Sequence, residues 1–506
     1  MVVLTLPVRT LRWLPLPVAC LLVASPAAAD TLQEALEQAY LTNPTLEAAR
    51  ATLRATDENV PIQRASGLPS ADTSGTLTEF LKQNQASFIA PERSLSATLN
   101  LAVPIYSGGA VRNGVRAAET RVEAGRADLR GTESALFSQV VAAYMDVIAN
   151  EALVGLSRNN VEVLTVNLEA TSDRFQIGDL TRTDVAQSES RLALARGDLR
   201  AAEANLVTAR ENYIALVGTA PTDLQPPPPL PGLPGEVATA VGIALENNPD
   251  LIAATERAVA AGFDIRVAGA GRLPRLETFA SAGYQNFLGS LGTIPGAGEA
   301  DQVATSAQAG LRLSLPLFQG GRVAAQQRQA QAQAGAALEQ VVSAERSVIA
   351  QVRAAYSSWR ASLAIIASSE TAVDAASLSL EGVRAENTVG NRTVLDILDA
   401  QQELLRAEVQ LITARRNAYV AGFSLLAAMG VAEARDLGLG DDLPLYDPAE
   451  NYGRVRNIIW DWSRDPDPVT RSTRTVDIPA PDADIPPERA IAPEQTAEDF
   501  ARPAVQ

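Results

Sequence analysis

The feature that most constrains this chain is an internal duplication with a nearly constant register. The run Val103–Gly109 (VPIYSGG) recurs 212 residues later as Leu315–Gly321 (LPLFQGG), and the same offset relates Gly178 to Gly390. Upstream matches are 205 residues apart, so the second copy gains seven residues at a point equivalent to 70–102. A repeat of this length predicts two copies of one structural unit.

Apolar residues recur every seven positions in four stretches of the chain. The seams are Val140, Val147, Val154, Val161, Leu168; Val352, Trp359, Ile366, Val373, Leu380; Val185, Leu192, Leu199, Leu206, Tyr213; and Ile397, Leu404, Leu411, Ala418, Leu425. Such seams indicate helices packed as coiled coils. The stretch from Gly109 to about Gln176 would be roughly 100 Å long as one helix. We therefore expect a long helical hairpin in each copy, turning at Gly178 or Gly390.

Before each long helix the apolar period changes from seven to two. The alternating positions are Leu95, Ala97, Leu99, Leu101, Val103 and Ala307, Ala309, Leu311, Leu313, Leu315. Segments of this kind are typical of transmembrane β-barrels, and a soluble half-buried hairpin is the alternative. Strands near 72–80 and 275–285 alternate less clearly. Because four strands cannot close a barrel and lipid tolerates no open edge, at least two copies must share one.

The N-terminus resembles a secretory leader. Arg9 and Arg12 precede the apolar stretch Trp13–Ala24, and Ala27-Ala28-Ala29 before Asp30 is a small-residue cleavage site. The stretch is too short to be a membrane anchor. Lipidation at Cys20 is a weaker alternative, because the Ala29 site lies downstream. We expect a mature chain that begins at Asp30 without lipid, which an intact mass measurement tests.

Composition excludes several classes of function. The chain has no histidine, and its single cysteine lies in the expected leader, so disulfides, thiol nucleophiles and the usual zinc ligands are excluded. A net charge of -17 disfavours nucleic acid as a partner. No enzyme motif is recognisable, and we expect no catalytic residue, cofactor or metal. No later segment appears to have the ~20 apolar residues of a transmembrane helix, so a membrane form must be a β-barrel.

Several of these features together resemble one family. The duplicated hairpins, the Asn-Pro pairs at 43–44 and 248–249, the Pro-x-aromatic-x-Gly-Gly joints and the run Val389–Ala400 (VGNRTVLDILDA) resemble TolC-type outer-membrane factors over 31–430. The resemblance implies a homotrimer with mixed architecture: the helical hairpins form a periplasmic α-barrel, and each chain gives four strands to a shared transmembrane β-barrel. It also implies an outer-membrane exit duct for efflux or type I secretion that docks a periplasmic adaptor and an inner-membrane pump of RND, ABC or MFS type.

The resemblance further implies a gate at the hairpin tips. Asp396 and Asp399 match two aspartates that ring the periplasmic mouth. Arg392 matches an arginine that holds the mouth closed, and Thr183 with Asp184 match its partners on the neighbouring hairpin. A six-carboxylate ring in a trimer resembles those that select cations in channels.

One position departs from the family pattern. Asn387 stands where the family's lock has a tyrosine, which predicts a looser closed state. The glycine turns at Gly178 and Gly390 are the expected adaptor-docking tips.

The residues themselves offer a second interpretation of part of this gate. Thr181 with Asp184 and Thr393 with Asp396 have the spacing of capping boxes after a glycine turn, which would give both acids a structural role. That interpretation leaves Asp399, one turn further along the same face, without an explanation. Tyr144 and Tyr356 are expected to be packing residues.

The chain divides into five parts. These are a signal peptide at 1–29, a first repeat at 30–220, a Pro-rich linker at 221–235, a second repeat at 236–430 and an acidic, Pro-rich tail at 431–506. The tail is expected to be mostly disordered, with a short helix within 446–462. A structural coiled-coil or adaptor protein without a barrel is the alternative function, and a hydrolase or other enzyme a distant third. The cargo cannot be read from the sequence.

Overall fold

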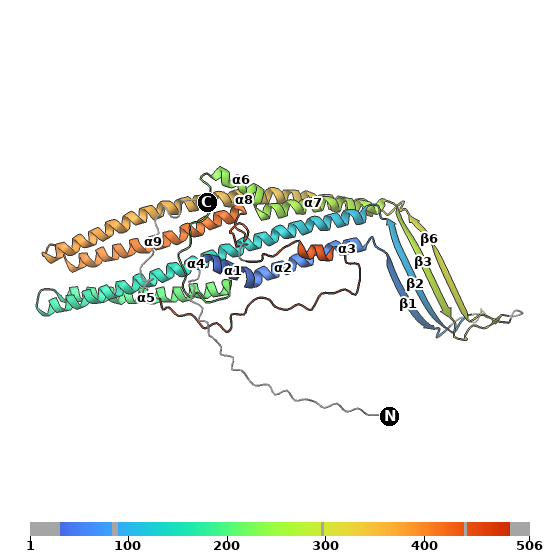
Figure 1. Ribbon diagram of the computed structural model, residues 1–506, viewed down its shortest axis with the longest axis horizontal. Coiled ribbons are helices and arrows are strands. Elements are labelled where there is room, and N and C mark those ends of the chain that lie inside the picture. The colour runs from blue at the N-terminus through green and yellow to red at the C-terminus, as the bar shows by residue number, and fades with distance from the viewer. Residues whose placement is uncertain (1–30, 83–89, 295–297, 440–442, 486–506) are drawn as a thin grey trace, which may run out of the picture.

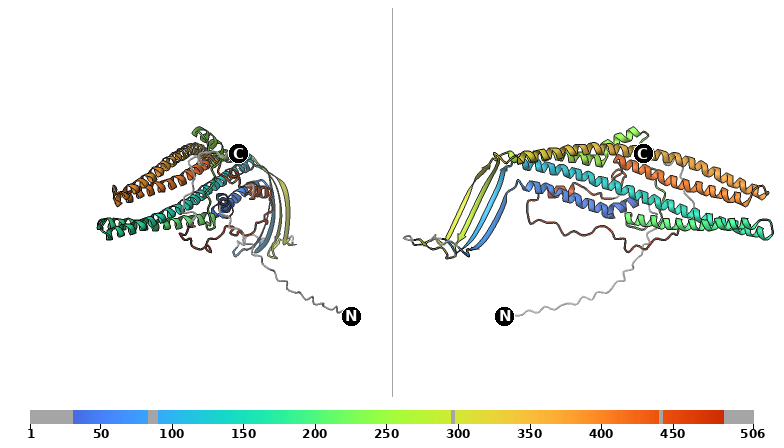
Figure 2. Two further views of the ribbon diagram at one scale, coloured as in Figure 1. Left: turned by 60° about the vertical axis from the view of Figure 1, so that its left-hand side comes forward. Right: turned by 180° about the vertical axis from the view of Figure 1, so that it is seen from behind.

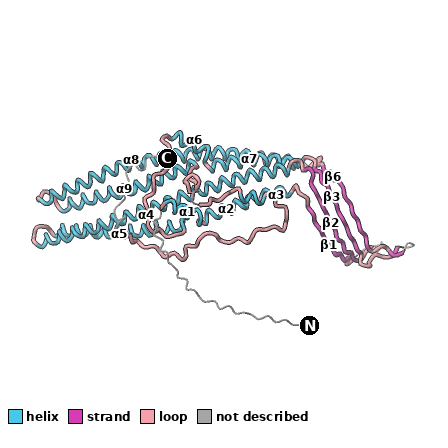
Figure 3. Tube along the Cα trace, viewed as in Figure 1, coloured by secondary structure: helices cyan, strands magenta, loops and turns pink. Residues whose placement is uncertain are grey.

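The chain forms a long helical bundle with one β-sheet at its end (Figures 1 and 3). The computed structural model describes residues 31–82, 90–294, 298–439 and 443–485. The expected leader at 1–29 lies outside these residues. In Figure 2 the sheet and the two hairpin tips again occupy opposite ends of the molecule.

The two repeats have matching elements. The first contains α1 (Leu32–Thr42), α2 (Pro44–Asp57), α3 (Asn59–Ala65), β1 (Ser70–Glu79), β2 (Arg93–Tyr106), α4 (Ala110–Gln176) and α5 (Arg182–Val217). The second contains α6 (Val237–Asn247), α7 (Pro249–Gly269), the short η1 (Ala270–Arg272), β3 (Arg275–Asn286), β4 (Thr293–Ile294), β5 (Gly298–Glu299), β6 (Val303–Ser314), α8 (Arg322–Thr388) and α9 (Val394–Met429). Both ends of α4 and α5 recur at the predicted offset of 212 residues in α8 and α9.

The heptad seams pack as predicted. Helix α4 pairs with α5 and α8 with α9, while α7 contacts both α4 and α8. Every residue of the four predicted seams is buried or half-buried, including Val147 and Ile366, which are fully enclosed. The bundle therefore continues from one repeat into the other through α7.

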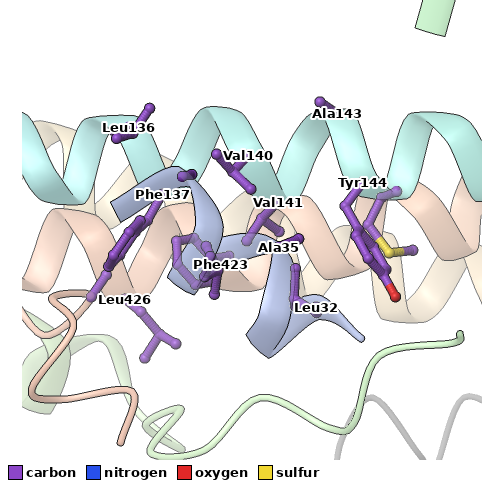
Figure 4. Close-up of a cluster of buried hydrophobic side chains, with 14 of the residues drawn as sticks. Leu32, Ala35, Leu136, Phe137, Val140, Val141, Ala143, Tyr144, Phe423 and Leu426 are labelled. Carbon is purple, nitrogen blue, oxygen red and sulfur yellow. The ribbon is translucent and has the colours of Figure 1, made fainter. Parts of the chain in front are cut away.

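The largest core lies midway along the bundle, where both repeats meet (Figure 4). Leu32 and Ala35 of α1 lie beside Phe137 of α4, and Phe423 of α9 completes the cluster. Fully burying side chains of this size contributes about 1.5–3 kcal/mol each. The amphipathic α1 thus joins the two hairpins at their middle.

Two tyrosines have more than the packing role expected from the sequence. Tyr144 is fully buried and Tyr356 half-buried, which confirms the packing prediction. Each hydroxyl also donates a 2.6 Å hydrogen bond to the Pro-rich linker, Tyr144 to the carbonyl of Gln225 and Tyr356 to that of Gly235. The linker is therefore held against both long helices.

The sheet is antiparallel in the order β1-β2-β3-β6, and its register separates an apolar from a polar face. Leu101 of β2 lies opposite Ala71 and Ala280, whereas the next residue but one toward the other face, Asn100, lies opposite Asp72 and Ser281. Directly opposed residues share a face. The alternating apolar positions predicted in β2 and β6 therefore form one continuous surface.

Hydropathy gives one difference from the sequence expectation. By length and composition alone, α4 and α8 each contain an 18-residue window apolar enough to cross a membrane. Residues within the α4 window are 61% buried by other helices. The abundance of alanine explains both facts, since small apolar residues raise mean hydropathy and allow close helix packing. We interpret both windows as bundle core.

The tail has more fixed contacts than its composition suggests. After α9 the chain forms turns and the short helix α10 (Glu450–Val455), then passes α3 and returns along the bundle as extended coil (Figures 1 and 2). Near 482–485 it is held by Arg210 of α5, which donates to the backbone carbonyls of Asp482 and Asp484 at 2.7 and 2.9 Å. Residues 486–506 lie outside the described part of the chain.

The glycine that ends α9 gives a testable packing prediction. Gly430 has φ +74°, and a Cβ there would lie 2.5 Å from the carbonyl oxygen of Asn247. Gly430→Ala should therefore cost about 1–2 kcal/mol for the left-handed backbone and a further ~1–3 kcal/mol for overpacking. Gly390→Ala is the matched control, because its φ is +82° but its Cβ would meet nothing within 4 Å. Equal thermal unfolding midpoints for the two variants would contradict the close contact.

Candidate functional site

The two hairpin tips share one turn geometry. Gly178 follows α4 with φ +84°, and Gly390 follows α8 with φ +82°. The amide of Asp179 donates to the carbonyl of Arg174 at 2.9 Å, and the amide of Asn391 to that of Glu386 at 3.0 Å. This pattern satisfies the last carbonyls of each long helix, and glycine is favoured because it tolerates positive φ without strain. Both predicted turns are therefore confirmed.

Both capping boxes are present. The carboxylate of Asp184 accepts the amide of Thr181 at 2.9 Å, and Asp396 accepts that of Thr393 at 2.8 Å. Hydrogen bonds from Thr181, first from its hydroxyl and then from its amide, lower the pKa of Asp184. The pKa of Asp396 is lowered by the same groups of Thr393, the amide first. Both acids thus begin the returning helices, as the structural interpretation predicted.

Arg392 is held within its own tip. Its Nε donates to Oε2 of Glu386 at 2.7 Å, and its Nη1 lies 3.9 Å from Oδ1 of Asp396. This bond to Glu386 raises the pKa of Arg392 further above its ordinary value. The amide nitrogen of Asn387 donates to the backbone carbonyl of Arg392 at 2.7 Å, so this residue orders the turn. The expected bond from Arg392 to Thr183 and Asp184 involves a neighbouring hairpin and stays a prediction.

An ion pair that the sequence analysis missed joins the two hairpins. Arg191 of α5 donates from Nη2 to Oδ1 of Asp399 on α9 at 2.6 Å. Beneath it, Leu398 packs with Leu164 and Leu192 of the first hairpin. The only sequence signal was the position of Arg191 seven residues after Asp184, which places both on one face of α5.

The tips carry ion pairs of opposite polarity. In the first hairpin Arg174 of α4 pairs with Asp179 of the turn at 2.7 Å. The offset of 212 aligns Arg174 with Glu386, and there the acid lies on the helix while the base, Arg392, lies in the turn. The scaffold is repeated, but the charges that it presents are not.

No acidic group at the tips forms a metal-binding cluster within the single chain. Among the described residues there is no group of three histidine, cysteine, aspartate or glutamate side chains placed to hold a metal ion. The carboxylates of Asp396 and Asp399 act instead on a helix cap and on an arginine. Their chemistry is therefore that of a charged surface able to attract cations.

Comparisons with known proteins agree with this architecture. The model of the family described as "Outer membrane efflux protein" matches residues 35–219 and 240–431. The outer membrane efflux protein BepC of Brucella suis is 33% identical over 88% of this chain and 94% of its own length. The outer membrane protein TolC of Escherichia coli is 29% identical over 81% of this chain and 84% of its own.

A solved structure supports the fold independently. The outer membrane protein VceC of Vibrio cholerae superposes with a TM-score of 0.68 at 24% identity, over 79% of this chain and 96% of that one. The two matched segments correspond to the two repeats, each with its pair of strands and its long hairpin. The chain therefore belongs to the outer membrane efflux protein family, as an outer-membrane exit channel for efflux or type I secretion that extends into the periplasm.

Proposed function

We propose that three copies of this chain form one channel, with a shared β-barrel in the outer membrane and a helical tunnel below it. The sheet carries this proposal. Its outer strands, β1 and β6, each have only one partner in the described chain, and together they leave two edges of at least ten residues. Unpaired backbone groups cost several kcal/mol each in lipid, so the edges must pair with neighbouring copies.

The two faces of the sheet fit such a barrel. The apolar surface that includes Leu101, Ala280 and Ala309 would face lipid, because opposed positions in all three strands are apolar. The other face carries Asn100, and the pair of Arg312 with Glu277 at 2.7 Å, which suit a water-filled lumen. Native mass spectrometry of the detergent-extracted protein should show three chains, and a stable monomer would contradict the proposal.

The hairpin tips would form the periplasmic mouth and the docking surface for an adaptor that connects to an inner-membrane pump. Gly178 and Gly390 lie at the extreme end of the bundle with nothing within 4 Å of a would-be Cβ. In the assembled mouth Arg392 would exchange or share its bond with Glu386 for Thr183 and Asp184 of the adjacent hairpin. The lock is therefore in competition with a pair inside the tip.

Arg191 provides a test of the carboxylate ring. It neutralises Asp399 at 2.6 Å, so the ring is less negative than its six aspartates alone would make it. Arg191→Gln should therefore lower the concentration of a trivalent cation needed to block the channel in planar bilayers. Arg406→Gln is the control, because Arg406 lies on the same helix α9 but is 70% exposed and pairs only loosely with Glu403 at 3.8 Å. An unchanged blocking concentration in Arg191→Gln would place Asp399 outside the ring.

A further inference from the structure

We propose that the tail segment 458–462 anchors the protein in the phospholipid interface at the periplasmic side of the outer membrane. The segment exposes three large apolar side chains in a row of five residues: Ile459 and Trp460 are each 70% exposed, and Trp462 is 84% exposed. It lies beyond the last residue matched by the family model. The proposal rests on the proposed function, in which the strands cross the membrane.

The location of the segment is set by its contacts. Ile458, Ile459 and Trp460 line one wall of a groove whose other wall includes Leu68 and Ser70, where α3 passes into β1. This joint is the level at which the helical tunnel meets the sheet (Figure 1). The segment therefore lies where the membrane surface must be if the strands span it.

The segment is held firmly at both ends. Arg64 of α3 donates through Nη1 to the carbonyl of Arg456 at 2.8 Å and to Oδ1 of Asn457 at 2.7 Å. On the other side Arg454 makes two 2.7 Å bonds to the carboxylate of Asp465. Exposed tryptophans on a loop restrained in this way remain directed outward at a fixed depth.

A lipid interface is the partner that fits this chemistry. Tryptophan is enriched at membrane–water boundaries because its ring is apolar and its N–H still reaches water or headgroups. Other exposed apolar residues lie at the same joints, including Phe318 after β6 at 89% and Tyr106 at the end of β2 at 50%. Arg464, which also lines the groove, supplies positive charge for lipid phosphates. Outer-membrane barrels carry aromatic girdles at these levels.

The chain provides its own fluorescence control. Of its four tryptophans, Trp13 lies in the expected leader and Trp359 is only 6% exposed, so Trp460 and Trp462 report on the segment. The full-length exported protein would be reconstituted into phosphatidylethanolamine–phosphatidylglycerol vesicles whose acyl chains carry bromine either near the headgroup or near the chain end. Channel conductance of the same preparation would be recorded in parallel.

We expect emission to be quenched by bromine near the headgroup and much less by bromine near the chain end. Trp359→Phe should keep this quenching, and the double variant Trp460→Ser with Trp462→Ser should lose it. A conducting channel without quenching would overturn the anchor and leave the proposed channel intact. Loss of the trimer in the double variant, without quenching in the native protein, would assign the segment to a neighbouring copy. Protein that neither inserts nor conducts would overturn both proposals.

Discussion

Replacing Arg392 with serine will raise the single-channel conductance several-fold in planar bilayers. In the proposed mouth this guanidinium restrains the hairpin of α8 and α9 against the neighbouring one, where Thr183 and Asp184 are its partners. The helices near the tip otherwise meet through small clusters, such as that of Leu398 with Leu164 and Leu192. Removing the charged bond should therefore let the tips separate.

Two further variants separate a lock from a general effect of charge. Arg406→Ser removes the same charge from α9 at a 70% exposed position and should leave the conductance unchanged. Glu386→Gln weakens the 2.7 Å pair that competes for Arg392 and should lower the conductance. If Arg392→Ser conducts like the native channel, Arg392 is only a residue that orders its own turn.

The carboxylate ring calls for asparagine rather than alanine substitutions. Asp396→Asn retains an oxygen that can accept the amide of Thr393, which the carboxylate now accepts at 2.8 Å. Combined with Asp399→Asn it should leave pore size similar while abolishing block by multivalent cations. Persistence of the block would show that the cation site lies elsewhere in the tunnel.

The second large effect concerns the buried ion pair that holds the tail. Arg210 and Glu151 are joined at 2.8 Å with side chains only 10% and 6% exposed. Arg210→Met should destabilise this part of the bundle by about 3–5 kcal/mol, because it leaves Glu151 charged and buried without its partner. It also removes the donor to the carbonyls of Asp482 and Asp484.

Hydrogen exchange measures this loss locally, which suits a membrane oligomer that does not unfold in two states. Amides of α4 and α5 around Glu151 and Arg210 should exchange faster by a factor of hundreds or more, and those near 482–485 should lose their protection. Arg158→Met is the control, since Arg158 is 37% exposed and its bond to the carbonyl of Ala483 is nearer to solvent. Similar exchange in both variants would show that the Arg210 pair is not the stabilising contact.

The parts of the fold that were predictable are those in which a local pattern repeats. Sevenfold spacing identified α4, α5, α8 and α9, and glycines at 178 and 390 located both turns, because only positive φ lets the chain reverse there. Alternation in β2 identified one face of the sheet. The offset of 212 residues doubled each of these signals, which made short strands recognisable.

The contacts between elements distant in sequence were not predictable in the same way. The pair of Arg191 with Asp399 depends on how two hairpins lie side by side, and the offset aligns Arg191 with Glu403, which gives no hint of it. Composition likewise suggested disorder after 431, although Arg210 and Arg64 fix the described tail through backbone carbonyls that no composition reveals.

The opposite polarity of the two tip ion pairs has a consequence for assembly. A trimer would present six tips around one axis, three with an arginine on the helix and three with a glutamate there. Six identical adaptor subunits could not all make the same contacts with such a rim, so they would have to bind as alternating halves of three dimers. The stoichiometry of the partner would then be written into a charge reversal between Arg174 and Glu386, two positions that the duplication made equivalent.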